Sequence, residues 1–284
     1  MKTRRTQMNR ILRRLPITMT LAFGLALPAA AAADTLETVK KRNAIAIGIK
    51  NDYKPFGYLD ENGEVTGFEI DLAKFIGKEI LGGGGTVELV PVVASNRIEL
   101  LNAGRIDLIL ATLGVNEKRA QVVDFTEEFY NMAGIVLMAP NDTTLATWDD
   151  VNGQTLCGIQ GNLYNRPLEE TYGADMMLFP GTSEMFSAYE DGRCAAMAFD
   201  GPILNLKLSE PGWGENNKIA VETFDYIPIA GGVRKGDTGF LEAVDAAILK
   251  AEAEGLLVEG EKTYSLGTSQ YVTDRAEAAK AAGY

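Results

Sequence analysis

The chain has 284 residues, 46% hydrophobic and 23% charged, which is the composition of a globular protein and excludes a disordered, collagen-like or coiled-coil one. Its formal net charge of −12 argues against nucleic acid as a partner, because phosphates require basic surface. Histidine is absent, which excludes serine–histidine and cysteine–histidine nucleophile pairs and histidine metal sites. Two cysteines are too few for a four-cysteine zinc or iron–sulfur site, so we expect neither a metal nor a cofactor.

Residues 1–33 have the three parts of a secretory signal peptide. A basic start precedes an apolar stretch, residues 15–27, which ends in the small residues Ala29–Ala33. The apolar stretch is shorter than the roughly 20 residues that cross a membrane, so we favour a cleaved signal over an anchor helix. Cleavage would remove basic and no acidic side chains and bring the net charge to −18. The sequence therefore predicts an exported protein.

Both cysteines, Cys157 and Cys194, lie after this signal. An oxidising compartment favours a disulfide between them, with two buried free thiols as the alternative. Closing a loop of this length would stabilise the fold by roughly 3–4 kcal/mol if the bond acts through chain entropy.

After the signal, β-rich runs alternate with helical runs. Strands are predicted at Ala44–Ile49, Thr86–Val93 and Ile106–Ala111, and helices at Phe68–Leu81 and Arg97–Asn102. The glycine run 82–85 ends the first of these helices. This β-α-β-α-β order predicts a mainly parallel sheet covered by helices.

A second set repeats this order. Its predicted strands are Leu156–Gln160, Met176–Phe179 and Ala195–Phe199, and its predicted helices are Asn162–Tyr172, Ser183–Glu190 and Asp200–Lys207. Extended runs at Gly134–Ala139 and Ile227–Val233 cross between the two sets, and helices are predicted at Thr238–Glu254 and in the tail, Ser265–Tyr284. We therefore expect an α/β protein of two lobes, one at 34–136 plus 230–284 and the other at 137–229. A cleft between such lobes suits a small polar ligand, with hinge closure around it.

Several stretches, in this order, resemble the exported solute-binding proteins of polar amino-acid ABC importers (extracellular solute-binding protein family 3). They are IGIKNDYKPF (47–56), GFEIDL (67–72), NRIELLNAGRIDLILAT (96–112), EKR (117–119), VDFT (123–126), GIQG (158–161), DGRC (191–194) and GVRKGD (232–237). The resemblance implies the two-lobed periplasmic-binding-protein fold (type II), with two hinge crossings. It also implies a periplasmic monomer that captures an amino acid without catalysis and delivers it to a membrane ABC permease. Pairing of the cysteine before GIQG with the cysteine in DGRC resembles a disulfide pattern of acidic and amide amino-acid binders in this family.

By the same resemblance, Arg119 holds the α-carboxylate of the ligand, for which a planar guanidinium is well shaped. Thr112 helps to hold the same carboxylate through its backbone or hydroxyl. Asp200 is expected to pair with the α-ammonium, and its alternative role is a plain N-cap. Gly161 and Asn162 are expected to open a helix whose backbone N–H groups meet the carboxylate.

Ligand specificity is assigned to Lys50 and Arg97, with Lys50 expected at the mouth of the cleft. Together with Arg119 they supply three cations against one anion, Asp200. This pattern of charges resembles that of the family members that bind acidic ligands. It therefore implies that the ligand is a dicarboxylic amino acid, aspartate or glutamate.

Tyr53 is expected to cover the ligand, whereas Phe56 is either a second aromatic wall or part of the core. Gly114 and Leu163 depart from the family, because residues with a hydroxyl are common at both positions. An N-substituted ligand or a non-amino dicarboxylate therefore stays open.

The runner-up is an enzyme on the same fold, since exported cyclohexadienyl (prephenate) dehydratases share a segment like Asp52–Phe56. Its general acid would be Glu99 or Glu69, although Glu69 is expected to face solvent.

Overall fold

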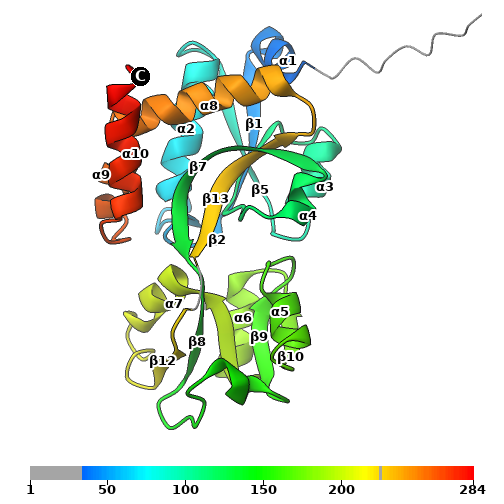
Figure 1. Cartoon of the computed structure of the whole chain (residues 1–284), viewed down its shortest axis with the longest axis vertical. Coiled ribbons are helices and arrows are strands. Elements are labelled where there is room, and N and C mark those ends of the chain that lie inside the picture. Colours follow the sequence, from blue (N-terminus) through cyan, green and yellow to red (C-terminus); the bar gives the residue numbers. More distant parts are fainter. Residues whose placement is uncertain (1–33, 224–225) are drawn as a thin grey trace, which may run out of the picture. The chain divides into compact units, whose positions relative to one another are not determined.

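The computed structural model describes residues 34–223 and 226–284 (Figure 1). The predicted signal peptide, residues 1–33, lies outside the described residues. Within the described ranges, no helix is both long enough and apolar enough to span a bilayer.

One five-stranded sheet, with its helices, forms what we call the first lobe. Its strands follow the order β5-β1-β6-β13-β7. They are β1 (Ala44–Ile49), β5 (Thr86–Pro91), β6 (Leu108–Leu110), β7 (Val123–Ala133) and β13 (Tyr226–Arg234). Strand β1 pairs in parallel with β5 and β6, whereas β13 runs antiparallel to β6 and β7. The helices are α1 (Thr35–Arg42), α2 (Phe68–Ile80), α3 (Arg97–Asn102), α4 (Glu117–Ala120), α8 (Thr238–Ala253), α9 (Leu256–Thr263) and α10 (Gln270–Ala281).

A second five-stranded sheet forms the second lobe, with strand order β10-β9-β11-β8-β12. Its strands are β8 (Ile135–Pro140), β9 (Thr155–Ile159), β10 (Asp175–Phe179), β11 (Ala196–Asp200) and β12 (Asn217–Val221). Here β9 pairs in parallel with β10 and β11, and β8 is antiparallel to β11 and β12. The helices are α5 (Asn165–Glu170), α6 (Thr182–Glu190), α7 (Gly201–Leu208) and a 3₁₀ turn, η1 (Trp148–Val151). A small sheet of β2 (Asp52–Tyr53), β3 (Gly57–Leu59) and β4 (Val65–Thr66) lies beside the first.

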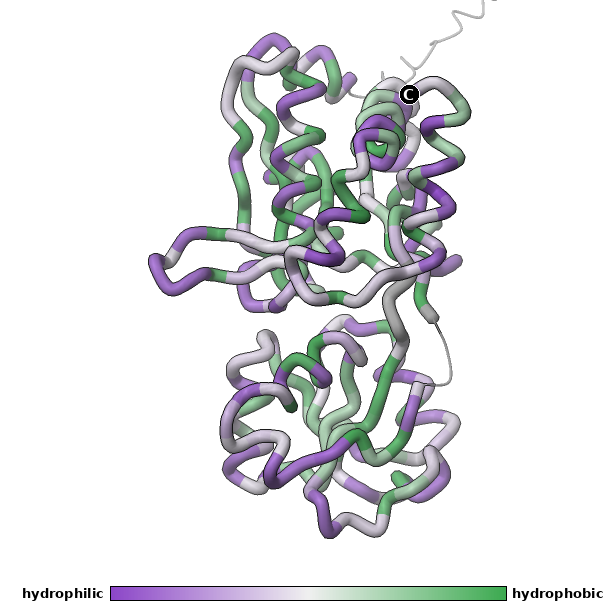
Figure 2. Tube along the Cα trace, turned by 90° about the vertical axis from the view of Figure 1, so that its left-hand side faces the viewer, coloured by the Kyte–Doolittle hydropathy of each residue, from purple (hydrophilic) through white to green (hydrophobic). Residues whose placement is uncertain are grey.

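The hydrophobic pattern explains the two sheets. Strand β1 is almost wholly buried, as a parallel strand covered on both faces should be. Helix α2 contacts β1 and β5 through a buried stripe. In Figure 2 the hydrophobic segments gather within each lobe, and the hydrophilic ones follow the outer turns. The predicted fold class, two lobes of mainly parallel sheet flanked by helices, is confirmed.

Some predicted elements differ in extent. The crossings, predicted only as extended runs, are the full strands β8 and β13, which take part in the sheets. The tail helix is present as α10 and packs against α8, α9 and β7. The helix predicted at Asn162–Tyr172 begins only at Asn165, because Gly161, at φ 85°, and its neighbours form a turn first.

Sheet membership places the two crossings near Gly134, after β7, and between the end of β12 at Val221 and the start of β13 at Tyr226. The predicted boundaries, 137 and 230, lie a few residues beyond these points. As lobe boundaries, they stay a prediction.

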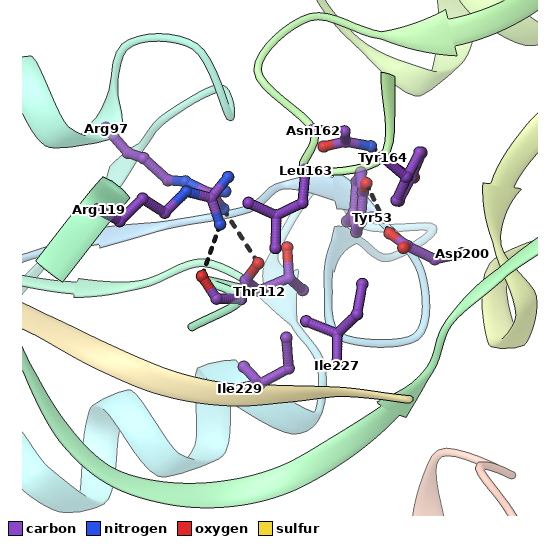
Figure 3. Close-up of a pocket in the computed structure, with 11 residues that line it drawn as sticks. Tyr53, Arg97, Thr112, Arg119, Asn162, Leu163, Tyr164, Asp200, Ile227 and Ile229 are labelled. Atoms are coloured by element: carbon purple, nitrogen blue, oxygen red, sulfur yellow. Dashed lines mark hydrogen bonds between the residues drawn. The ribbon is translucent and has the colours of Figure 1, made fainter. Parts of the chain in front are cut away.

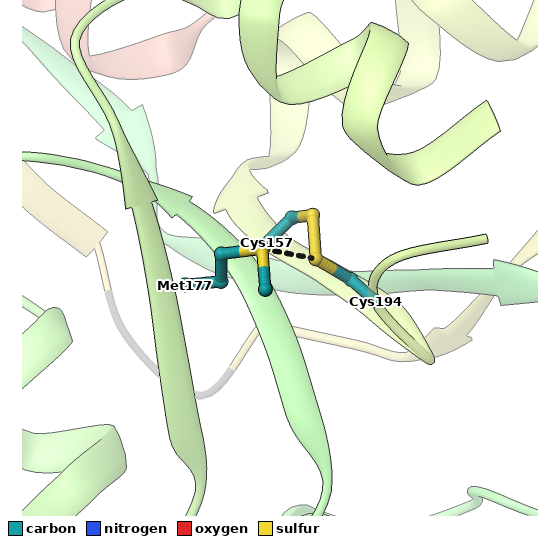
Figure 4. The surroundings of a disulfide bond; sticks show 3 residues. All are labelled: Cys157, Met177 and Cys194. Carbon is teal, nitrogen blue, oxygen red and sulfur yellow. Dashed lines mark hydrogen bonds between the residues drawn. A yellow bond between two sulfur atoms is a disulfide. The ribbon is translucent and has the colours of Figure 1, made fainter. Parts of the chain in front are cut away.

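A disulfide joins Cys157 of β9 to Cys194, just before β11, with 5.6 Å between the Cα atoms (Figure 4). The predicted pairing is confirmed, and the alternative of two free thiols is wrong. The bond ties together two parallel strands whose carboxyl ends lead to Gly161 and Asp200.

Candidate functional site

A pocket lies between the two lobes (Figure 3). Its lining consists of Tyr53, Arg97, Thr112, Gly114 and Arg119 from the first lobe, Asn162, Leu163, Tyr164 and Asp200 from the second, and Ile227 and Ile229 from β13. Most of the predicted ligand-binding residues therefore meet at one place. Lys50, Phe56 and Gly161 are outside this lining.

Arg119 comes from the short helix α4, whose start is capped by the side chain of Asn116. Its guanidinium donates Nη1–H to the carbonyl of Gly114 at 2.7 Å and Nη2–H to the carbonyl of Gly161 at 2.9 Å. The second bond crosses from one lobe to the other. Burial, and then the positive charge of Arg97, lower the pKa of Arg119 to about 9.

Arg97 is almost fully buried at the start of α3. Its Nη1 donates to the carbonyls of Ala111 and Thr112, and its Nε has no hydrogen-bond partner among the described residues. Burial lowers the pKa of this guanidinium. The guanidinium groups of Arg97 and Arg119 are both removed from water and repel each other. An anion bound beside them in the pocket would therefore be stabilised.

The structure adds Glu69, for which the expectation of a solvent-facing side chain is wrong. Glu69 is 1% exposed, and its two carboxylate oxygens accept the N–H of Thr112 at 2.9 and 2.8 Å. The hydroxyl of Tyr130 donates to the same carboxylate at 3.2 Å, and burial raises the pKa of Glu69 to about 7. The signal was present in the sequence, because Glu69 shares a helical stripe with Ala73 and Ile76.

This network limits what Thr112 can do. Its φ of 50° is left-handed, and its N–H is taken by Glu69. Its hydroxyl donates to the carbonyl of Ala111 at 2.8 Å. Thr112 thus presents a hydroxyl oxygen, and not a free N–H, toward the pocket, and it positions Arg97 through its carbonyl.

Asp200 is the last residue of β11 and is buried. Although it occupies the N-cap position of α7, its side chain makes no capping hydrogen bond, so the interpretation as a plain N-cap is wrong. The hydroxyl of Tyr53 donates to Oδ2 of Asp200 at 3.0 Å. Burial raises the pKa of Asp200 to about 6, while hydrogen bonds from Tyr53 and Tyr164 oppose that rise. Ionised Asp200 is therefore a buried anion that a cation would stabilise.

The turn at Gly161 and Asn162 was predicted to offer backbone N–H groups to the ligand, and the structure shows a different arrangement. Asn162 donates its side-chain N–H to the hydroxyl of Tyr164 at 2.6 Å, and its backbone N–H lies 3.3 Å from the carbonyl of Ile159. Since α5 begins three residues later, a helix N-terminus at Gly161 is not present. Gly161 instead offers its carbonyl to Arg119.

Lys50 does not lie at the mouth of the cleft, because it is 1% exposed. Its Nζ is 3.4 Å from Oδ1 of Asp52 and 4.5 Å from the ring centroid of Tyr53. It thus stands behind the aromatic wall of the pocket. Phe56 is also buried and stacks on Tyr130, with 5.3 Å between the ring centroids, so it belongs to the core.

Leu163, Ile227 and Ile229 make one part of the lining apolar. A Cβ added at Gly114 would lie 2.7 Å from Ile227 and 2.8 Å from Leu163. Glycine at this position therefore makes room for the apolar side chains. The two departures from the family pattern, Gly114 and Leu163, are thus one packing arrangement.

Among residues 34–223 and 226–284, no group of three or more aspartate, glutamate or cysteine side chains could hold a metal ion. Of the two proposed general acids, Glu99 is exposed on α3, and Glu69 is outside the lining of the pocket.

A model of the bacterial extracellular solute-binding proteins, family 3, matches residues 45–267. This chain belongs to that family. A glutamine-binding protein of Geobacillus stearothermophilus is 31% identical over 218 residues, which cover 75% of this chain and 81% of the relative. It follows that the chain is an amino-acid-binding, exported component of the kind that serves ABC importers and their membrane permeases.

Solved structures agree with this assignment. A cysteine-binding protein from Campylobacter jejuni has a TM-score of 0.76 and 29% identity, covering 81% of this chain and 92% of its own. The ancestral amino acid-binding protein AncCDT-1, a precursor of cyclohexadienyl dehydratase, has a TM-score of 0.71 and 27% identity, covering 82% and 99%.

Proposed function

We propose that this chain captures an amino acid in the pocket between its lobes, with the carboxylate against Arg119 and Arg97 and the ammonium against Asp200. One observation carries the proposal: the pocket has two guanidinium groups on one side and a buried carboxylate on the other (Figure 3). A zwitterion placed across it would match both charges, which would otherwise stay buried and poorly compensated.

The ligand is further proposed to be acidic, aspartate or glutamate. The lining contains two arginines and a single carboxylate, Asp200, which leaves a positive charge for a second ligand carboxylate. Lys50 adds to this positive potential from behind Tyr53, although it is itself paired with Asp52.

A second candidate is an amino acid with an uncharged side chain. The apolar lining of Leu163, Ile227 and Ile229 favours it, because a ligand carboxylate would lose its hydration there without a partner.

We propose capture and not catalysis, by a monomer in the periplasm. The carboxyl group in the lining is that of Asp200, which is hydrogen-bonded to Tyr53 and faces the arginines across the pocket. A dehydratase would need a general acid beside the leaving hydroxyl, and Glu99 and Glu69 are both outside the lining.

The test is isothermal titration of the mature protein, residues 34–284, with aspartate, glutamate, glutamine, leucine, succinate and prephenate. Tightest binding of aspartate or glutamate is the expected result. Tighter binding of glutamine or leucine would refute the acidic ligand and keep amino-acid capture. Failure of every amino acid to bind would refute capture, and turnover of prephenate would refute the absence of catalysis.

A further inference from the structure

Strand β2 has only two residues, and both of them contact the second lobe. Asp52 accepts the backbone N–H of Thr182 through Oδ2 at 2.9 Å, and the hydroxyl of Thr182 donates to the carbonyl of Asp52. Tyr53 donates to Asp200, as described above. The contact of Tyr53 lies in the pocket, whereas Asp52 and Thr182 are outside its lining.

Helix α6 lacks an N-cap side chain of its own. Its N-cap residue is Gly181, and the first N–H groups of a helix need acceptors from elsewhere. Asp52 supplies one from the other lobe, with a negative charge at the positive end of the helix. A segment 130 residues away in sequence thus completes α6.

Lys50 supports the same carboxylate from behind. Its Nζ lies 3.4 Å from Oδ1 of Asp52 and has no hydrogen-bond partner among the described residues. Burial lowers the pKa of Lys50, and the charge of Asp52 opposes this shift. One oxygen of Asp52 therefore faces Lys50, and the other holds α6.

We propose that Asp52 is a positioning residue that sets ligand affinity and residence time by fastening α6 to β2, without touching the ligand. The proposal rests on capture between the lobes, as proposed above. A contact that exists only when the lobes are together favours the closed state. The apparent dissociation constant rises in proportion when the population of the closed, binding-competent state falls.

The first test is Asp52→Ala in the mature protein, titrated in parallel with the wild type with aspartate, glutamate, glutamine and leucine. We expect the dissociation constant to rise about fivefold to thirtyfold, mostly through a faster off-rate. Asp52→Asn keeps an acceptor oxygen for Thr182 and should recover part of the affinity. The control is Asp60→Ala. In the part of the chain that the structure describes, the carboxylate of Asp60 accepts N–H groups from its own turn alone, so this variant should change affinity less than about twofold.

Gly181→Ala provides an independent variant. Its φ of −136° accommodates alanine, but the new Cβ would lie 2.8 Å from Oε2 of Glu184 and 2.9 Å from Oδ2 of Asp52, so it would displace both carboxylates. The affinity of Gly181→Ala should also fall, by a smaller factor than that of Asp52→Ala. This variant also keeps the proposal testable if Asp52→Ala does not fold.

A structural readout separates fastening from general stability. Small-angle X-ray scattering of the liganded proteins should show a larger radius of gyration for Asp52→Ala than for wild type at partial saturation, and equal values for Asp60→Ala. Unchanged affinity and off-rate in both Asp52→Ala and Gly181→Ala would overturn the proposal. If the wild type binds no amino acid, it is the proposed function that fails.

Discussion

On the first-lobe side of the pocket, hydrogen bonds to backbone carbonyls orient the positively charged side chains. On the second-lobe side, hydrogen bonds from tyrosine hydroxyls orient a negatively charged one. Arg119 and Arg97 donate to carbonyl oxygens of short turns, and Asp200 accepts from Tyr53. These hydrogen bonds orient each group, and within residues 34–223 and 226–284 none of the three groups forms a direct ion pair that would neutralise it. The charges therefore remain available to a ligand that carries both signs.

In the ligand-free protein, both sides carry a charged group that burial disfavours. Burial lowers the pKa of Arg119 to about 9 and raises that of Asp200 to about 6. Both shifts favour the neutral form, which is the direction that loss of hydration imposes. A zwitterionic ligand would reverse both shifts, so binding should stabilise each charge.

The largest expected effect is on the arginine side. Arg119→Ala should weaken amino-acid binding at least about a hundredfold, because it removes a partly buried cation and its link to Gly161. Calorimetric titration measures the loss. Arg166→Ala is the control, since the side chain of that arginine is 73% exposed and, among the described residues, forms an ion pair with Glu170 alone. Binding within threefold of wild type in Arg119→Ala would mean that the cationic side does not hold the carboxylate.

Asp200→Asn tests the anionic side alone. The amide can still accept the hydroxyl of Tyr53, but it cannot neutralise an ammonium. We expect amino-acid affinity to fall about tenfold to a hundredfold, whereas binding of succinate, which has no ammonium, should be unchanged or stronger. An equal loss for both ligands would show that Asp200 acts by supporting the pocket and not by pairing with an ammonium.

The pH dependence of binding follows from the same residue. The pKa of Asp200 is about 6 when the pocket holds no cation, so protonation below pH 6 removes the partner of the ammonium. Affinity should therefore fall as the pH is lowered through about 6, by up to about tenfold per pH unit well below it. Titrations from pH 5 to 8 should show this fall in the wild type and not in Asp200→Asn.

The comparison with Asp200→Asn is needed because Glu69 titrates nearby, with a pKa of about 7. The contribution of Glu69 to the pH dependence of binding is the same in both proteins, so the difference between them isolates Asp200.

The pH dependence of folding stability runs in the opposite direction to that of binding. The folded-state pKa of Asp200 is raised, so its contribution to stability is present below about pH 4 and lost as the pH rises through 6. For binding, an equal fall in the affinity of Asp200→Asn as the pH is lowered would assign the pH dependence of affinity to groups other than Asp200.

The sequence predicted the parts of this arrangement that depend on local pattern. Alternating β-rich and helical runs reflect periodic burial, which local residues determine, and the motif around Arg119 placed it near Thr112. The helical stripe with Ala73 and Ile76 indicates that Glu69 is buried, but its hydrogen-bond partners, the N–H of Thr112 and the hydroxyl of Tyr130, lie 43 and 61 residues away. No local pattern reports such partners.

Tertiary contacts also explain why Lys50 is buried and not at the mouth of the cleft, where it was predicted. Its position after β1 was predicted correctly, but its direction depends on Asp52 and Tyr53, which fold back over it. The start of α5 was missed because Gly161 needs a left-handed turn for its approach to Ala94, where a Cβ would lie 2.8 Å from the backbone. Contacts within the first lobe therefore account for Glu69 and Lys50, and a contact between the lobes accounts for the start of α5.

The smallest expected effect concerns the apolar part of the lining. Leu163→Thr replaces an apolar side chain at the pocket by a shorter one with a hydroxyl, and it removes the contact above Gly114. If the ligand has an apolar side chain, its affinity should fall about threefold to tenfold, as expected for the loss of a few buried methyl groups. An acidic ligand should change less than about twofold, because its distal carboxylate would face the arginines. Titrating one protein with leucine and aspartate in parallel therefore decides between the two candidate ligands, and equal changes for both would place Leu163 outside the ligand's side-chain contacts.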